Sequence, residues 1–238
     1  MDKILGTPVS EAPENDHWMS VSDLMAGLMI VFLFVAVAMM HFVRIERDRI
    51  KEIAMAYRDT QVSLYKDLQA EFEQDLQGWG AEIDPQTLEV RFLNPDMLFE
   101  PGRAQMRSSF RDVMRDFIPR YFSVVLRYKE KVEEVRIEGH TSSDWGGVAS
   151  VDEAYFNNMA LAQSRTREVL TLAYALARDD GERSWVRKKI AAVGYSSARP
   201  VTDDVGNEDV RRSRRVSFRV ITDSETQIKR IIHDSPEG

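Results

Sequence analysis

An acidic residue stands at the edge of the most apolar stretch of the chain. Asp23 directly precedes residues 24–40, which contain no charge and no proline. As a helix this stretch covers about 25 Å, and its flanking residues extend it enough to cross a hydrocarbon core of roughly 30 Å. A carboxylate is costly there, so an acid at this place is by default an ion or proton site. By position alone, Asp23 equally fits a helix N-terminal residue at the headgroup level, stabilised by the helix dipole.

The neighbours of Asp23 favour the ion site. Ala26 and Gly27 are small, so that another helix can approach closely beside the acid. Trp18 is typical of membrane interfaces and places Asp23 below the aromatic level. The sequence therefore predicts a transmembrane helix over residues 18–43, with a carboxylate packed against partner helices.

Around this acid the chain reads W-x-S-x-x-D-L-M-x-x-x-M, formed by Trp18, Ser20, Asp23, Leu24, Met25 and Met29. The motif resembles the transmembrane helix of MotB-type stator subunits, and is most similar to the B subunits of Zorya anti-phage defence complexes. The resemblance implies that Asp23 binds and releases a transported proton or sodium ion, with no other cofactor. It also implies a homodimer of this chain inside a multi-span MotA-like subunit, the Zorya A subunit.

A second set of motifs lies in the C-terminal half. In order they are V-R-I-E-G-H-T over residues 135–141, N-x-x-L-x-x-x-R at Asn158, Leu161 and Arg165, G-Y at Gly194 and Tyr195, Pro200, and R-R-V over residues 214–216. Over residues 88–223 these motifs resemble an OmpA-like peptidoglycan-binding domain. The resemblance implies non-covalent binding of the cell-wall peptide stem, with a loop acid and a helix arginine contacting its diaminopimelate residue.

The implied ligand explains the residue types. It carries a carboxylate and an ammonium on one carbon, and an arginine fork can hold the carboxylate through two hydrogen bonds. Asn158, Leu161 and Arg165 are spaced to share one helix face. Each also has an ordinary interpretation: a surface arginine for Arg165, a core residue for Leu161, and a polar residue near a helix N-terminus for Asn158.

The chain departs from the family pattern in two places. The loop after His140 lacks the family's acid in H-T-D, so Asp144 is the candidate replacement, and Asn157 is a further candidate contact. Ser213 replaces the asparagine that usually precedes the two arginines. Arg214 and Arg215 can hold the ligand loop or brace the last strand, and the sequence does not decide between these roles.

A few elements must position these residues. We predict a cytoplasmic tail over residues 1–17, the membrane helix, a helical linker over 44–80, an OmpA-like domain over 81–223 and a C-terminal tail over 224–238. Within the domain, alternating patterns predict strands at 88–93, 132–139, 189–194 and 214–221. Longer patterns predict helices at 103–127, interrupted at Pro119, and at 155–177. The predicted fold class is α+β, a βαβαββ domain whose mixed sheet is covered by two helices.

The linker carries an imperfect apolar stripe, made of Ile50, Ile53, Tyr57, Leu64, Leu68 and Phe72. It predicts either pairing with a second copy or a solvated helix. Gly78 and Gly80 are expected to end this helix.

Composition narrows the function further. The net charge of −7 argues against a nucleic-acid role, and the absence of cysteine excludes disulfides and thiol catalysis. The four histidines are too scattered for a zinc site, and the sequence contains no P-loop, G-x-G-x-x-G or G-x-S-x-G motif. We therefore expect no enzymatic activity.

The orientation of the membrane helix rests on two conflicting signals. Before the helix only Lys3 is basic, whereas Arg44, Arg47, Arg49 and Lys51 follow it, which by the positive-inside rule places the C-terminal part in the cytoplasm. The OmpA-like resemblance places it in the periplasm. We follow the resemblance and expect a single-pass protein of the bacterial inner membrane, with a cytoplasmic N-terminus.

Together these features predict an ion-conducting, wall-anchored stator subunit of a proton- or sodium-driven membrane motor. The acidic N-terminal tail and the short chain favour Zorya defence over a flagellar MotB-type stator, which is the first alternative. The second alternative is a passive tether from membrane to wall without ion flow, in which Asp23 is only a helix-cap residue.

Overall fold

The computed structural model describes the backbone of residues 15–93, 98–146 and 150–234. The chain divides between Glu52 and Ile53 into two compact units. Each is described by itself below.

The N-terminal unit consists of the first part of one long helix, α1 (Asn15–Trp79). Its apolar side chains are open to the surroundings, with Leu24, Met29 and Phe34 each at least 70% exposed. In the described part of the chain, α1 is the one helix long and apolar enough to cross a membrane. This exposure suits a helix surrounded by lipid or by partner helices rather than by its own chain.

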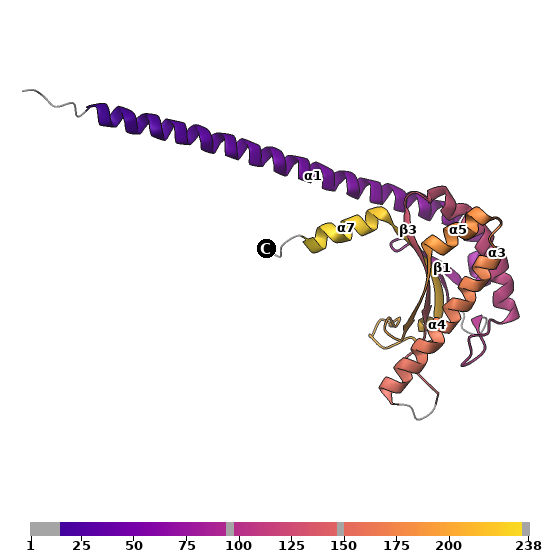
Figure 1. Cartoon of the computed structure of the whole chain (residues 1–238). Coiled ribbons are helices and arrows are strands. Elements are labelled where there is room, and N and C mark those ends of the chain that lie inside the picture. The colour runs from indigo at the N-terminus through magenta and orange to yellow at the C-terminus, as the bar shows by residue number, and fades with distance from the viewer. Residues whose placement is uncertain (1–14, 94–97, 147–149, 235–238) are drawn as a thin grey trace, which may run out of the picture. The chain divides into compact units, whose positions relative to one another are not determined.

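The second unit is built on a five-stranded mixed sheet (Figure 1). Its strands are β1 (Ala81–Asp84), β2 (Glu89–Phe92), β3 (Val132–His140), β4 (Ile190–Ser196) and β5 (Arg215–Thr222). They lie in the order β1-β2-β5-β3-β4; β3 and β4 are parallel and the other pairs antiparallel. Val216, Phe218 and Val220 of β5 are buried on the core face. The predicted fold class is confirmed.

The helices of this unit follow the sequence patterns closely. They are α3 (Ser108–Val125), the 3-10 turn η1 (Leu126–Tyr128), α4 (Val151–Ala175), α5 (Asp180–Lys189), α6 (Val210–Ser213) and α7 (Asp223–Asp234). The predicted interruption at Pro119 is wrong, because α3 continues through it. Buried residues flank Pro119 in the sequence on both sides, and their packing stabilises the helix across the proline. They are Phe117, Ile118, Tyr121 and Phe122.

Besides the short helix α6, three elements go beyond the predicted βαβαββ order, namely β1, α5 and α7. The short strand β1 forms a hairpin with β2, closed by the side chain of Asp84, which accepts hydrogen bonds from the N–H groups of Gln86 and Thr87. Helix α5 is capped by Asp179, the residue before it, whose carboxylate accepts from the N–H of Glu182. Residues expected as a tail form α7 up to Asp234.

The C-terminal part of α1 belongs to the core of this unit. Leu64, Leu68 and Phe72 have no exposed surface, and Phe72 lies 5.0 Å from the ring of Phe117 in α3. The predicted pairing of these three side chains with a second copy is therefore wrong, because the chain's own core already covers them. The helix ends where expected, since Gly80 adopts a left-handed conformation (φ 61°) directly after Trp79.

Candidate functional site

A cavity of about 430 Å³ opens beside the C-terminal end of β3 and the first half of α4. Four predicted site residues line it: Asp144, Asn158, Leu161 and Arg165. The fifth, Asn157, is exposed and is not among the lining residues. The opposite wall comes from the segment before α3, including Phe99 and Arg107. The structure thus brings four of the five candidates together.

Asn158 holds the loop that follows β3. Its side chain is buried, and its Nδ2 donates to the main-chain oxygens of Ser142 and Asp144, each over 3.2 Å. Helix α4 itself starts with a capping box, in which Ser150 and Glu153 bind each other's backbone N–H groups. Asn158 therefore shapes the loop from a fixed helix.

Within the described part of the chain, the Arg165 guanidinium is held by backbone oxygen and an aromatic ring and has no carboxylate partner. Its Nε donates to the main-chain oxygen of Arg103 over 3.0 Å, and its guanidinium lies 4.8 Å from the centre of the Phe99 ring. Burial, and then the nearby charge of Arg214, lower the pKa of Arg165 to about 10. A positive charge fixed in this way at a cavity wall suits an anionic ligand.

The two arginines of the R-R-V motif divide the roles that the sequence left open. Arg214 donates from Nε to the Oγ of Ser142 over 2.9 Å, and its Nη2 lies 4.0 Å from Asp144 Oδ2, so it contacts the ligand loop. Arg215 donates to the main-chain oxygens of Ser213 and Arg199 and braces the start of β5. Arg214 ends the short helix α6, whereas Arg215 is the first residue of β5.

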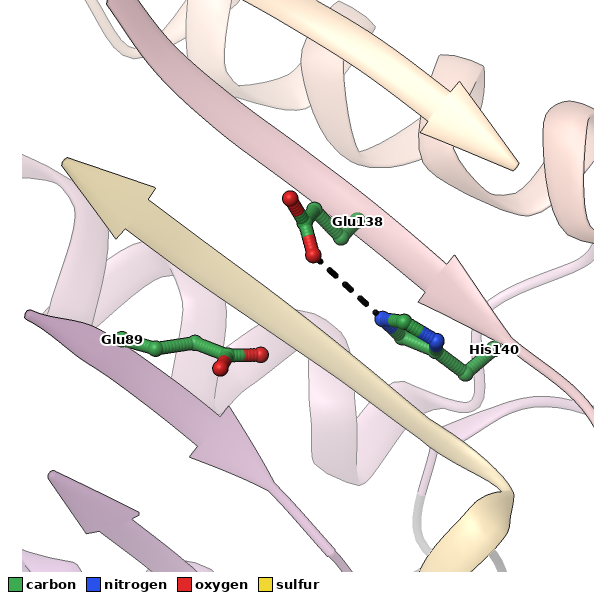
Figure 2. Close-up of side chains that lie close together, drawn as sticks. All are labelled: Glu89, Glu138 and His140. Carbon is green, nitrogen blue, oxygen red and sulfur yellow. Dashed lines mark ion pairs between the residues drawn. The ribbon is translucent and has the colours of Figure 1, made fainter. Parts of the chain in front are cut away.

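A buried polar cluster lies on the sheet face opposite the helices. Figure 2 shows Glu138 and His140 on β3 and Glu89 on β2. His140 Nε2 is 3.5 Å from Glu138 Oε2, and all three residues are buried. The pKa of His140 is lowered, chiefly by burial and also by the charge of Arg215, although Glu138 opposes this. Sequence reasoning missed the two glutamates, although both stand in alternating strand segments.

The ligand-type atoms of this cluster lie within 4.8 Å of one another, close enough for a metal ion to be considered. The surrounding charges argue against one. Arg91 contacts Glu89 over 2.8 Å, Arg199 lies 3.8 Å from Glu138, and the charge of Arg215 acts on both glutamates. Because arginines already balance the carboxylates, a divalent cation would add unpaired positive charge to a buried site. We interpret the cluster as the support of the strand end that carries the ligand loop.

In the N-terminal unit, α1 runs through Asp23 without a break. The helix begins at Asn15, eight residues earlier, so Asp23 lies in its third turn. The unpaired N–H groups and the dipole act over the first turn only. This position gives no support to the interpretation of Asp23 as a cap residue.

No family model matches the chain. A curated protein described as Zorya protein ZorB, from Escherichia coli strain Crooks, is 53% identical over 235 residues, which are 98% of this chain and all of the relative. The chain belongs to the ZorB family. The resemblance noted around Asp23 is thereby confirmed at the level of the family.

Two solved structures are similar to this ZorB family member over part of its chain. A MotB-like protein from Desulfovibrio vulgaris matches with a TM-score of 0.50 at 20% identity, covering 72% of this chain and 94% of that one. The cell wall anchor of the type VI secretion system from Pseudomonas aeruginosa matches with a TM-score of 0.45 at 22% identity, covering 66% and 97%. The first of these likenesses shows a MotB-like fold.

Proposed function

We propose that this ZorB family member is the ion-conducting, wall-anchored stator subunit of a Zorya anti-phage defence motor. The observation that carries the anchoring part is the Arg165 guanidinium, fixed at a cavity wall with no carboxylate partner among the described residues. Family membership over the whole chain supports the assignment to Zorya.

In the anchoring step, Arg165 holds a carboxylate of the diaminopimelate residue in the peptidoglycan stem. A guanidinium already bound to backbone and stacked on Phe99 loses little conformational freedom when the ligand arrives. Asn158 and Arg214 keep the loop open as the second wall of the site. The domain lies in the periplasm, where peptidoglycan is found.

In the ion step, Asp23 accepts a proton or sodium ion from the periplasmic side and releases it towards the cytoplasm. Neutralising the carboxylate removes its desolvation cost and lets surrounding helices move past it. One charge crossing 100 mV supplies about 2.3 kcal/mol. Because one helix cannot form the pathway, the proposal includes a homodimer of this chain within a multi-span MotA-like subunit. The chain itself has no catalytic role in this proposal.

The main rival is a passive tether between membrane and wall. The place of Asp23 in the third turn of α1 favours the motor, since a tether needs no acid there. A flagellar MotB-type role is disfavoured by the 53% identity to a ZorB protein.

The experiment compares Asp23→Asn and Arg165→Ala in cells that carry the full defence system. A motor needs both residues, so each variant should lose phage protection, while only Asp23→Asn should abolish ion flux with wall binding intact. Arg167→Ala, an exposed arginine two residues along α4, is the matched control. If Asp23→Asn kept full protection against phage, the passive tether would explain the protein better than the motor.

A further inference from the structure

The ligand cavity carries more positive than negative charge. Among its described lining residues are the four arginines Arg107, Arg165, Arg214 and Arg215, against the single acid Asp144. Two of these arginines are balanced from outside the cavity: Arg107 pairs with Glu100 over 3.4 Å, and Arg215 is influenced by two buried glutamates. The charges left to a ligand are therefore those of Arg165 and Arg214.

Nearby acids neutralise little of the positive charge on the guanidinium groups of Arg165 and Arg214. No carboxylate in the described part of the chain forms an ion pair with Arg165, and the charge that perturbs its pKa is the like charge of Arg214. Asp144 lies 4.0 Å from Arg214, but its side chain is 68% exposed, so water screens that pair. An anion between the two arginines would relieve their repulsion.

Several oxygens of the loop that could accept from an ammonium already accept a hydrogen bond within the chain. The main-chain oxygens of Ser142 and Asp144 accept hydrogen bonds from Asn158, and the Oγ of Ser142 accepts one from Arg214. Glu208 binds the backbone N–H and the hydroxyl of Ser143. The side-chain acceptors that remain on this loop include the Thr141 hydroxyl, which is uncharged, and the Asp144 carboxylate, which faces Arg214.

We infer that this site, if it binds the wall as proposed above, selects its ligand by two carboxylates and does not require the ammonium. The ligand class is an acidic stem peptide with two free carboxylates at its diamino-acid end. Arg165 holds one carboxylate and Arg214 the other. Asp144 then restrains Arg214 and makes no ammonium contact.

The test is calorimetric titration of the full chain in detergent micelles with three peptides. The parent is L-Ala-γ-D-Glu-meso-diaminopimelate; in the second peptide the side-chain amine is acetylated, and in the third the side-chain carboxylate is amidated. Acetylation should leave the dissociation constant within about twofold, whereas amidation should raise it at least about tenfold, the effect expected for a lost charged hydrogen bond. A tenfold loss on acetylation would overturn the inference while keeping wall binding. No binding of any peptide would overturn both.

Variants test the same inference from the protein side. Asp144→Asn should bind the parent peptide as tightly as the unmodified chain or more tightly, since it removes a negative charge beside the ligand carboxylates; Asp204→Asn, in an exposed loop, is the matched control. Arg214→Lys should keep the preference for the free carboxylate and Arg214→Gln should lose it. A loss of about tenfold or more in Asp144→Asn alone would assign the ammonium to Asp144 and overturn the inference.

Discussion

The Nδ2 of Asn158 donates to the main-chain oxygen of Ser142 over 3.2 Å, so a buried side chain of α4 fixes the loop that follows β3. Because the same nitrogen also reaches the oxygen of Asp144, one amide sets the path of the ligand loop at two points. Loop and helix therefore act as one binding surface.

Asn158→Ala should weaken binding of wall peptides and lower the free energy of unfolding by about 1–3 kcal/mol, the cost of leaving buried groups unpaired. Asn157→Ala is the natural control, because Asn157 is exposed and lies outside the cavity lining. Titration with peptide and chemical denaturation measure the two effects. Equal losses in both variants would mean that Asn157 contacts the ligand directly, as the sequence had suggested.

The sequence patterns predicted most of the sheet because the central strands alternate strictly, as in Val216, Phe218 and Val220. They missed β1 and α5, which are short and polar; the Asp84 side chain closes the turn after β1, and the Asp179 side chain caps the start of α5. Periodicity shows which side chains share a face, but not which surface covers that face. The stripe therefore predicts pairing with a second copy or a solvated helix, whereas Leu64, Leu68 and Phe72 lie in the chain's own core.

At the candidate site, too, the spacing of residues predicts which side chains share a face but not what each of them contacts. Motif spacing brought Arg165 and Asn158 to one face of a helix, and the structure shows both at the cavity. Their different positions, with Arg165 at the cavity wall and Asn158 holding a loop, depend on hydrogen bonds across more than ten residues of chain. Spacing within one element carries no information on such contacts.

His140 should make the stability of the domain depend on pH. Its pKa is lowered in the folded chain, mainly by burial, so the unfolded chain binds the proton more readily. The free energy of unfolding should therefore fall as the pH drops below about 6.5, the ordinary pKa of histidine. Denaturation curves between about pH 7.5 and pH 5 measure the effect, above the range in which carboxylates titrate.

His140→Gln should flatten this part of the pH profile, because the titrating group is gone. Below that range the carboxylates of Glu89 and Asp84 become protonated. Because their pKa values are lowered in the folded chain, this protonation should destabilise both proteins equally. An unchanged slope between about pH 7.5 and pH 5 in the variant would show that another group is responsible.

Arg120 should be required for the attachment of α1 to α3. Its guanidinium binds Glu71 over 2.7 Å and Asp75 over 2.8 Å, and lies 5.0 Å from the centre of the Phe72 ring. Arg120→Ala should lower the free energy of unfolding by about 1–3 kcal/mol, because it removes charge-assisted hydrogen bonds and stacking together. Arg115→Ala, which loses one exposed pair with Asp112, should cost under about 0.5 kcal/mol. Comparable losses in the two variants would indicate that the Arg120 contacts add nothing beyond a surface pair.

Two glycines set the distance between α4 and the sheet. Gly139 of β3 and Gly194 of β4 are neighbours in the parallel register, and a Cβ on Gly194 would lie 2.6 Å from the backbone nitrogen of Gln163. Since the obstacle is helix backbone, Gly194→Ala should push α4 outwards at a cost of about 1–3 kcal/mol.

That displacement should also weaken peptide binding, because Asn158 and Arg165 both project from α4. Gly78→Ala is the control: it sits in a helix with open space around it, so it should be neutral or stabilise the chain by up to about 1 kcal/mol. Denaturation and titration of the full chain compare the two. If Gly194→Ala kept both its stability and its affinity, the close packing of α4 on β4 would not be what positions the site.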